Sequence, residues 1–211
     1  MRLVIDSGNT LVKAAIFDGD QLRHKVEFDK DSILNAGLNA EYQNVNAVAV
    51  SDVSNMSAPL IECLPVHIPV LRVSGHTPVP VKVDYHTPET LGTDRLAGVV
   101  YAASLFPGRN ILVIQAGTCF TYDLLTENNE YAGGAISPGL DMKLRALNTF
   151  TARLPLFDKE VSPPLLGCNT KESILSGVIN GSVAEIDGMI NSFRSKLSNL
   201  EVILGGGDMP Y

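Results

Sequence analysis

The chain of 211 residues lacks the features that mark several classes of protein. Its three cysteines, Cys63, Cys119 and Cys168, form no CxxC pair and have no histidine at zinc-ligand spacing. A disulfide framework and a structural zinc site are therefore excluded, and reduced thiols are expected. No apolar run is long enough to span a membrane, and the first residues, MRLVID, show no export signal. A cytoplasmic protein with no membrane partner is predicted.

Positive charge is also scarce. The chain has 16 Lys and Arg against 23 Asp and Glu, a net charge of -7, and no basic cluster, so no nucleic-acid partner is expected. What the chain does contain is the composition of a soluble globular protein, with 45% hydrophobic and 18% charged residues. A chain of this length buries roughly 70% of its unfolded surface, which suits one large domain or two small lobes.

Hydrophobic periodicity predicts an α/β chain in which strands alternate with helices. Three β-like runs near the start, separated by turn signals such as Asp18-Gly19-Asp20, predict an antiparallel meander. The irregular stretch 74–93 is long enough to be a functional loop. The predicted strands are Leu3–Asp6, Leu11–Phe17, Leu22–Phe28, Val45–Val50, Val70–Val73, Ile111–Ile114 and Cys119–Leu125, and the predicted helices are Asp29–Ala40, Ser54–Leu64, Asp94–Leu105 and Ser182–Leu197.

The chain contains an internal repeat. Leu3-Val4-Ile5-Asp6-Ser7-Gly8 matches Leu112-Val113-Ile114-Gln115-Ala116-Gly117, apolar for apolar and glycine for glycine. Two copies of strand, glycine turn and strand predict two lobes of similar architecture that hold a ligand between them, with backbone N–H groups at each turn for phosphates. Two ordinary hairpins would give the same match, so both interpretations stay open.

The turn Asp6-Ser7-Gly8-Asn9-Thr10, followed by Lys13, has the residue types of a phosphate site. Glycine permits close backbone approach, the hydroxyl and amide side chains donate, and the lysine brings positive charge. Asp6, at the strand end, is placed to hold a water bound to Mg²⁺. Neither GxxxxGK[ST] nor GxGxxG is present, and an Asx turn between two strands is the alternative.

Six segments, in order along the chain, resemble those of the type III pantothenate kinases, which belong to the superfamily of acetate and sugar kinases, Hsp70 and actin. Together they cover almost the whole chain and are far more specific than one glycine loop. Asp6–Lys13 resembles the DxGNTxxK phosphate motif, Gly92–Arg95 the GxDR motif, Gly117–Asp123 the second phosphate segment GTAxTxD, and Gly133–Gly139 the GGxIxPG turn, while Asn169–Gly177 and Gly205–Asp208 are similar to two further family segments.

The resemblance implies an α/β fold of two duplicated actin- and ribonuclease-H-like lobes, each a mixed sheet flanked by helices, with a ligand cleft between them. The lobes are expected to span residues 1–108 and 109–211. Family members usually continue past the Gly205–Asp208 segment with a helix and a strand, so this chain is expected to lack the last elements of the fold. The resemblance also implies a homodimer in which the second subunit forms part of the pantothenate pocket.

The implied reaction is transfer of the γ-phosphoryl group of ATP to the primary hydroxyl of pantothenate, which gives 4'-phosphopantothenate in the first step of coenzyme A biosynthesis. ATP, Mg²⁺ and a monovalent cation, K⁺ or NH₄⁺, are the implied cofactors. Phosphoryl transfer needs positioning, charge neutralisation and a carboxylate that accepts the hydroxyl proton. Asp94 matches the family's proton acceptor, and a helix N-cap before Arg95 is its alternative role.

The other implied roles carry over position by position. Nucleotide contacts are implied for Asp6, Ser7, Gly8, Asn9, Thr10, Leu11, Val12, Lys13 and Thr118, and pantothenate contacts for Tyr85, Gly92, Thr93, Asp94, Arg95 and Thr170. Besides Asp94, three of these residues have an alternative. Lys13 also suits a solvated strand position, Tyr85 a half-buried aromatic that covers the loop, and Thr170 the N-cap of a helix that begins near Lys171.

Gln115 is the main departure from the family. It stands where the family has an aspartate that helps to hold the monovalent cation, and glutamine offers a carbonyl oxygen but no charge. We therefore expect weakened cation activation or impaired catalysis. A catalytically weak relative that binds or regulates is the alternative function. A phosphatase or another sugar-type kinase of the superfamily is disfavoured by Tyr85 and the Gly92–Arg95 loop.

Overall fold

The computed structural model describes the chain except for residues 9, 30–31, 33–43, 55 and 63. The described residues form two compact units, one of residues 1–78 and 86–97 and the other of residues 79–85 and 98–211. Each unit has its own sheet and its own apolar core. The lobe limits 1–108 and 109–211 stay a prediction.

The first unit is built on a five-stranded sheet in the order β3-β2-β1-β4-β5. β1 (Arg2–Ser7) pairs antiparallel with β2 (Val12–Asp18), which pairs antiparallel with β3 (Gln21–Phe28). This confirms the predicted meander. β4 (Ala47–Asp52) lies parallel to β1, and β5 (Val70–Arg72) lies parallel to β4, so the sheet is mixed.

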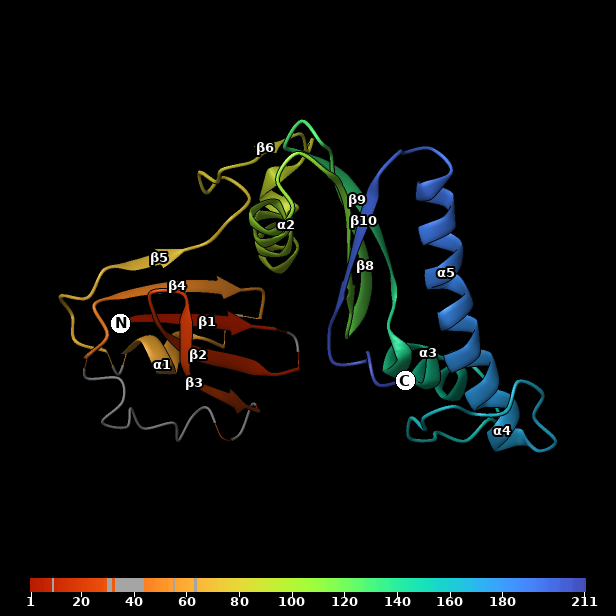
Figure 1. Cartoon of the computed structure of the whole chain (residues 1–211). Helices are drawn as coiled ribbons and strands as arrows, with labels where there is room; N and C mark the ends of the chain where they lie inside the picture. Colours follow the sequence, from red (N-terminus) through yellow and green to blue (C-terminus); the bar gives the residue numbers. More distant parts are fainter. Residues whose placement is uncertain (9, 30–31, 33–43, 55, 63) are drawn as a thin grey trace. The chain divides into compact units, whose positions relative to one another are not determined.

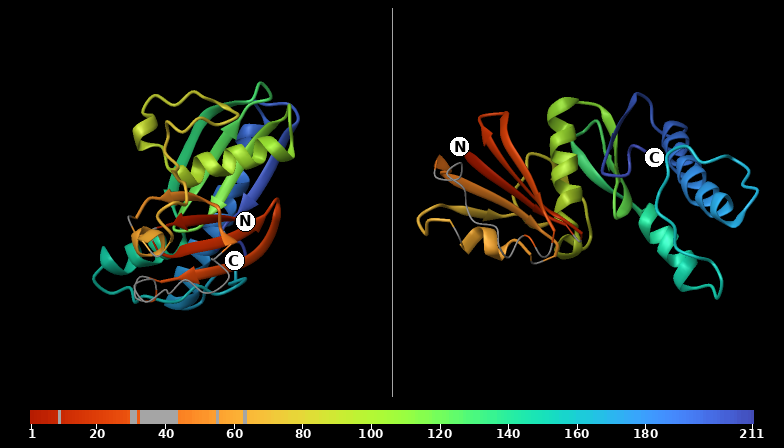
Figure 2. Two further views of the ribbon diagram at one scale, coloured as in Figure 1. Left: turned by 90° about the vertical axis from the view of Figure 1, so that its left-hand side faces the viewer. Right: turned by 90° about the horizontal axis from the view of Figure 1, so that it is seen from below.

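The alternation of residues along β1 decides which side chains this sheet buries and which it leaves for a site. Leu3 and Ile5 point into a core that also contains Leu60 of the short helix α1 (Ala58–Glu62), seen beside the strands in the right-hand view of Figure 2. Because neighbouring residues of a strand point to opposite faces, Asp6 projects from the other face, at the carboxyl end of β1.

The second unit repeats this arrangement. Its sheet has the order β10-β7-β8-β9-β6, in which β7 (Asn110–Ala116), β8 (Cys119–Leu125) and β9 (Glu130–Pro138) form an antiparallel meander. β10 (Leu200–Gly205) lies parallel to β7, and β6 (Lys82–Val83) lies parallel to β9. The run β10-β7-β8-β9 has the order and strand directions of β4-β1-β2-β3, which confirms the prediction of two lobes with similar architecture.

Helices cover both faces of the second sheet (Figure 1). On one face, α3 (Leu140–Thr149), α4 (Thr170–Leu175) and α5 (Gly181–Arg194) pack on apolar residues of β7 and β8. A π-helical turn, residues 176–180, joins α4 to α5. On the other face lies the part of α2 (Thr93–Leu105) that belongs to this unit. The predicted helices at residues 94–105 and 182–197 are confirmed, with α5 ending three residues early.

Two predicted helices have a different outcome. Ser54–Leu64 contains only the short helix α1, and Asp29–Ala40 lies almost entirely outside the described residues. Within the described part of the chain, no helix combines the length and the apolar character needed to cross a membrane.

A polar network fixes α3 and α5 to the second sheet. Tyr122 of β8 donates a hydrogen bond to Glu185 of α5 over 2.8 Å, and Lys143 of α3 donates to Glu185 over 2.7 Å and to Ser182 over 2.8 Å. Burial and the Glu185 carboxylate raise the pKa of the Tyr122 phenol, which keeps it a donor. Burial alone would raise the pKa of Glu185, but hydrogen bonds from Lys143, Ser137 and Tyr122 hold it below its ordinary value.

Candidate active site

At the carboxyl end of β1, the carboxylate of Asp94 lies close enough to Asp6 to raise the pKa of Asp6. Asp6 belongs to β1 and Asp94 to the first turn of α2, and both lie in the first unit. Burial raises the pKa of Asp6, the charge of Asp94 raises it further, and Lys13 and a hydrogen bond with Ser51 only partly offset this. Lys13 faces Asp6 across the β1–β2 pair and is half-buried rather than fully solvated. Two carboxylates that repel each other in this way favour a bound cation.

Ser51, which no sequence motif indicates, connects the two parts of this site. It faces Asp6 across the parallel pair of β1 and β4, and it hydrogen-bonds with Asp6. Its hydroxyl also shares a hydrogen bond of 2.8 Å with the buried hydroxyl of Thr93. The start of α2 is therefore tied to β1 through one serine. Only the register of β4 on β1 reveals this position.

The Gly92–Arg95 segment is shaped around the Asp94 carboxylate. A Cβ at Gly92 would lie 2.6 Å from the Asp94 Oδ1 atom, so the glycine leaves the room that this oxygen occupies. The same oxygen accepts a hydrogen bond of 2.8 Å from the Arg95 N–H. Asp94 is the second residue of α2 and so lies inside the first turn of the helix, not before it. The helix start therefore holds the Asp94 carboxylate near Asp6. Arg95 itself is buried.

A cavity of about 350 Å³ opens beside this segment. Gly92 and Thr93 line it together with two acidic residues, Asp52 and Glu89. Asp52 accepts hydrogen bonds from the backbone N–H groups of Ser54 and Ser57, both over 3.2 Å. The acidic lining suits hydroxyl and amide donors of a ligand better than a carboxylate group.

The first glycine turn closes on itself. Gly8 donates its N–H to the carbonyl of Leu11 over 3.0 Å, and the buried hydroxyl of Ser7 shares a hydrogen bond of 2.7 Å with Ser54. Val12 is fully buried in the core, whereas Thr10 is exposed. Asn9 lies outside the described residues. Hydrogen bonds thus fix the described residues on both sides of Asn9, and the predicted contacts of this turn with phosphate stay a prediction.

Three sequence motifs converge on the second glycine turn. Gly139, which ends the Gly133–Gly139 segment, donates its N–H to the Thr118 carbonyl over 3.1 Å. A Cβ on Gly139 would lie 2.0 Å from the Gly117 oxygen, and one on Gly206 would lie 2.0 Å from the Ala116 oxygen. Gly206 also has a φ of +117°, which a residue with a side chain rarely adopts. The exposed Thr118 thus lies at the centre of a tightly built turn.

Lys159 fixes the Gly205–Asp208 segment. No sequence motif indicates this lysine. Its ammonium group donates to the carboxylates of Asp208 over 2.7 Å and of Asp141 over 2.9 Å. Burial lowers the pKa of Lys159, but these hydrogen bonds and charges outweigh burial and raise it above its ordinary value. Asp208 in turn donates its backbone N–H to the Ala116 carbonyl over 2.9 Å. Lys159 therefore braces the Gly205–Asp208 segment against the second turn.

The remaining predicted residues lie in the second unit. Gln115 of β7 is half-buried beside α2, where a Cβ on Gly98 would lie 2.9 Å from its Nε2 atom. Tyr85 is half-buried and stacks on Tyr131, which agrees with its alternative as a covering aromatic and leaves its ligand contact a prediction. Thr170 is the exposed first residue of α4.

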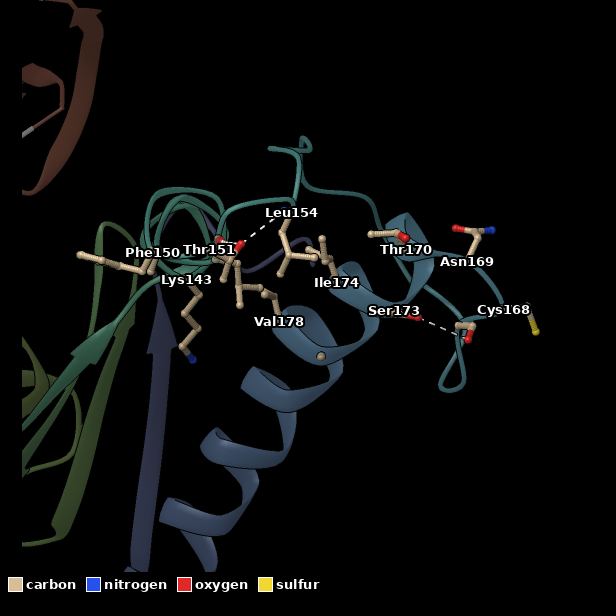
Figure 3. Close-up of a pocket in the computed structure, with 14 residues that line it drawn as sticks. Lys143, Phe150, Thr151, Leu154, Cys168, Asn169, Thr170, Ser173, Ile174 and Val178 are labelled. Carbon is tan, nitrogen blue, oxygen red and sulfur yellow. Dashed lines mark hydrogen bonds between the residues drawn. The ribbon is translucent and has the colours of Figure 1, made fainter.

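The alternative role of Thr170 as a helix cap is wrong. The N-cap of α4 is Asn169, whose side chain accepts a hydrogen bond of 3.0 Å from the Glu172 N–H. Thr170 instead lines a largely apolar cavity of about 1080 Å³ between α3 and α4, with Phe150 and Leu154 among the side chains drawn in Figure 3. The predicted site residues thus divide between the units, with Asp6, Lys13, Thr93 and Asp94 in the first and Tyr85, Gln115, Thr118 and Thr170 in the second.

Comparison with known proteins places these residues in a family. A sequence model of the type III pantothenate kinase family matches residues 2–192. The type III pantothenate kinase of Christiangramia forsetii is 43% identical over 210 residues, which are 99% of this chain and 86% of that protein. One from Bacteroides fragilis has the same identity and coverage. The chain belongs to the type III pantothenate kinase family.

Two solved structures support the fold. A Campylobacter jejuni protein assigned to the Baf family of transcriptional activators aligns with a TM-score of 0.61 at 18% identity, over 98% of this chain and 83% of its own. A Sinorhizobium meliloti protein assigned as a 2-dehydro-3-deoxygalactonokinase aligns with a TM-score of 0.52 at 12% identity, over 99% of this chain and 94% of its own. At these identities the likeness concerns the fold alone.

The carboxylate of Asp6 and the ammonium group of Lys13, in the first unit, fit the divalent metal and the nucleotide that a kinase of this family implies. Mg²⁺ is usually held by one or two carboxylates, with waters and substrate phosphates as its other ligands, and Asp6 at the end of β1 supplies one such carboxylate. In the described part of the chain, no cluster of three or more His, Cys, Asp or Glu side chains could hold a metal ion. A single carboxylate suits a metal whose other ligands are waters and the phosphates of the nucleotide.

Replacing Lys159 tests the brace on the Gly205–Asp208 segment. Lys159→Met leaves the nearly buried Asp208 carboxylate, 6% exposed, without its cation and should lower the free energy of unfolding by about 2 kcal/mol. Urea unfolding measures the loss. Lys171→Met is the matched control, because it breaks an exposed ion pair with Glu160 and should change stability by less than about 1 kcal/mol. Equal losses in the two variants would contradict the brace.

Proposed function

We propose that the protein transfers the γ-phosphoryl group of ATP to the primary hydroxyl of pantothenate and so makes 4'-phosphopantothenate, the first step of coenzyme A biosynthesis. Family membership over almost the whole chain supports this reaction. The observation that carries it is the pairing of Asp6 with Asp94, beside Lys13, in the first unit. A cytoplasmic location and the lack of nucleic-acid and membrane partners stay predictions from the sequence.

Asp94 is the proposed proton acceptor. As the bond from the substrate oxygen to the γ-phosphorus forms, the carboxylate takes the hydroxyl proton, and the bond from phosphorus to the bridging oxygen of ADP breaks. The hydrogen bond from Arg95 and the space left by Gly92 hold the Asp94 carboxylate in one orientation, which such a transfer needs. Bound Mg²⁺, held by Asp6 through water, would neutralise phosphate charge.

The other roles follow the family positions. Lys13 and Thr118, with the first turn, bind the phosphates of ATP. Gly92, Thr93, Arg95, Tyr85 and Thr170 bind pantothenate. Arg95 is the buried cation of this set, and a buried guanidinium is the usual partner of a carboxylate such as that of pantothenate.

Replacing Asp94 tests the reaction. Asp94→Asn should lower kcat for pantothenate phosphorylation by about a hundredfold or more, because an amide cannot accept the proton. A coupled assay with ATP, Mg²⁺ and pantothenate measures it, and Asp20→Asn, at an exposed turn, should keep full activity. If the chain binds pantothenate or nucleotide but shows no turnover, the kinase proposal fails and the binding or regulatory alternative takes its place.

Gln115 is proposed to weaken the monovalent-cation site. Gln115→Asp restores a negative ligand and should increase activation by K⁺ or NH₄⁺ relative to Na⁺, because a carboxylate holds a cation more strongly than an amide oxygen does. Initial rates in the three chloride salts measure this, with Gln21→Asp on exposed β3 as the control. Ordinary K⁺ dependence in the native chain, unchanged in Gln115→Asp, would show the idea to be wrong.

A homodimer is proposed as the working form, with the second subunit covering the cavity of Figure 3. Phe150, 84% exposed, lines that cavity beside the proposed substrate residue Thr170, and an exposed apolar patch of this kind suits a protein contact. Sedimentation should give the mass of two chains, and Phe150→Glu should give one chain and a higher KM for pantothenate. Leu22→Glu, at an exposed position of β3, should remain dimeric. A monomeric native chain with full activity would exclude the proposal.

A further inference from the structure

The segment that carries Tyr85 is held on the edge of the second sheet. β6 has only two residues, too few to keep its place without a partner. The Lys82 N–H donates to the Asn129 carbonyl over 2.9 Å, and the Asp84 N–H donates to the Tyr131 carbonyl over 3.1 Å. The Lys82 ammonium group also pairs with Glu130. The backbone in the middle of the predicted functional loop, residues 74–93, is therefore held by the start of β9.

A buried pair of side chains continues this support inward. Tyr131 and Asp123 are both fully buried, and the Tyr131 hydroxyl donates to Asp123 Oδ1 over 2.7 Å. A hydrogen bond to a carboxylate is stronger than one between neutral groups. The Tyr131 ring stacks on Tyr85, with ring centroids 6.0 Å apart and planes within 7°, a separation typical of offset-stacked aromatic rings. Contacts thus run from Asp123, inside the second unit, to the half-buried Tyr85.

We propose that Asp123 and Tyr131 are positioning residues that hold the Tyr85 ring in place for pantothenate, an inference that rests on the proposed function. Tyr131 fixes the plane of the Tyr85 ring by stacking, and Asp123 fixes the Tyr131 ring by its hydrogen bond. The pair acts on Tyr85, which contacts substrate in the proposed function, and takes no part in proton or phosphoryl transfer. Loss of the pair should therefore weaken pantothenate binding and leave the chemical step unchanged.

Steady-state kinetics test the substrate side. Tyr131→Phe keeps the ring but loses the donor, and it should raise KM for pantothenate about tenfold, as loss of a hydrogen bond to a charged group would. KM for ATP and kcat should stay within about twofold of the native values. Asp123→Asn, whose amide oxygen still accepts the hydrogen bond from Tyr131, should keep most of the native affinity for pantothenate.

Tyr122→Phe is the matched control. It removes a hydrogen bond from a buried tyrosine of the neighbouring strand β8 to the carboxylate of Glu185 in α5, so it should lower stability without raising KM for pantothenate. An unchanged KM in folded Tyr131→Phe, or equal increases in the KM values of both substrates, would overturn the positioning role.

A second measurement separates this inference from the proposed function. The chain has no tryptophan, so Tyr85→Trp introduces a single fluorescent reporter. Adding Tyr131→Phe should lower the anisotropy of that tryptophan and increase its quenching by acrylamide, whereas adding Tyr122→Phe should change neither. A response to Tyr131→Phe without pantothenate-dependent turnover in the native chain would overturn the proposed function alone. Turnover without such a response would overturn the positioning inference alone.

Discussion

The backbone after β7 is approached so closely from two directions that no side chain fits between. A Cβ on Gly139 or on Gly206 would lie 2.0 Å from a carbonyl oxygen of this turn, far inside van der Waals contact. The start of α3 and the segment after β10 can therefore reach the turn only as glycine. Thr118, the phosphate residue predicted for this unit, occupies a turn whose shape the two glycines determine.

In this acidic chain, the main polar sites each pair a lysine with a carboxylate. Each of three lysines lies against carboxylates that are at least half-buried: Lys13 beside Asp6, Lys143 beside Glu185, and Lys159 beside Asp208. In the second and third cases the hydrogen bonds outweigh the cost of burial, as the pKa directions of Glu185 and Lys159 show. The pKa of Asp6 is raised instead, because burial and the charge of Asp94 together exceed the opposing effects of Lys13 and the Ser51 hydrogen bond. A carboxylate left under-compensated is suited to a cation that arrives with the nucleotide.

The sequence allowed prediction of those parts of the molecule that depend on local pattern. Alternation revealed the strands, the repeat revealed the paired sheets, and the glycine motifs marked both turns. Ser51, Lys159 and Tyr131 were missed because their roles depend on register and on contacts between segments far apart in the chain. Ser51 matters only because β4 pairs with β1 in one register, and Lys159 because its loop reaches Asp208, 49 residues away. Thr170 was misread as a possible cap because Asn169, one residue earlier, competes better for that position.

Two neighbouring residues of β8 illustrate how one strand serves stability and function at once. Tyr122 and Asp123 point to opposite faces because strand side chains alternate. On one face Tyr122 joins Glu185 and Lys143 and fixes α3 and α5. On the other face Asp123 holds Tyr131, on which Tyr85 stacks. Since a shift of one residue would exchange the two faces, the register of β8 couples the packing of the helices to the position of Tyr85. Selection for either property therefore constrains the other.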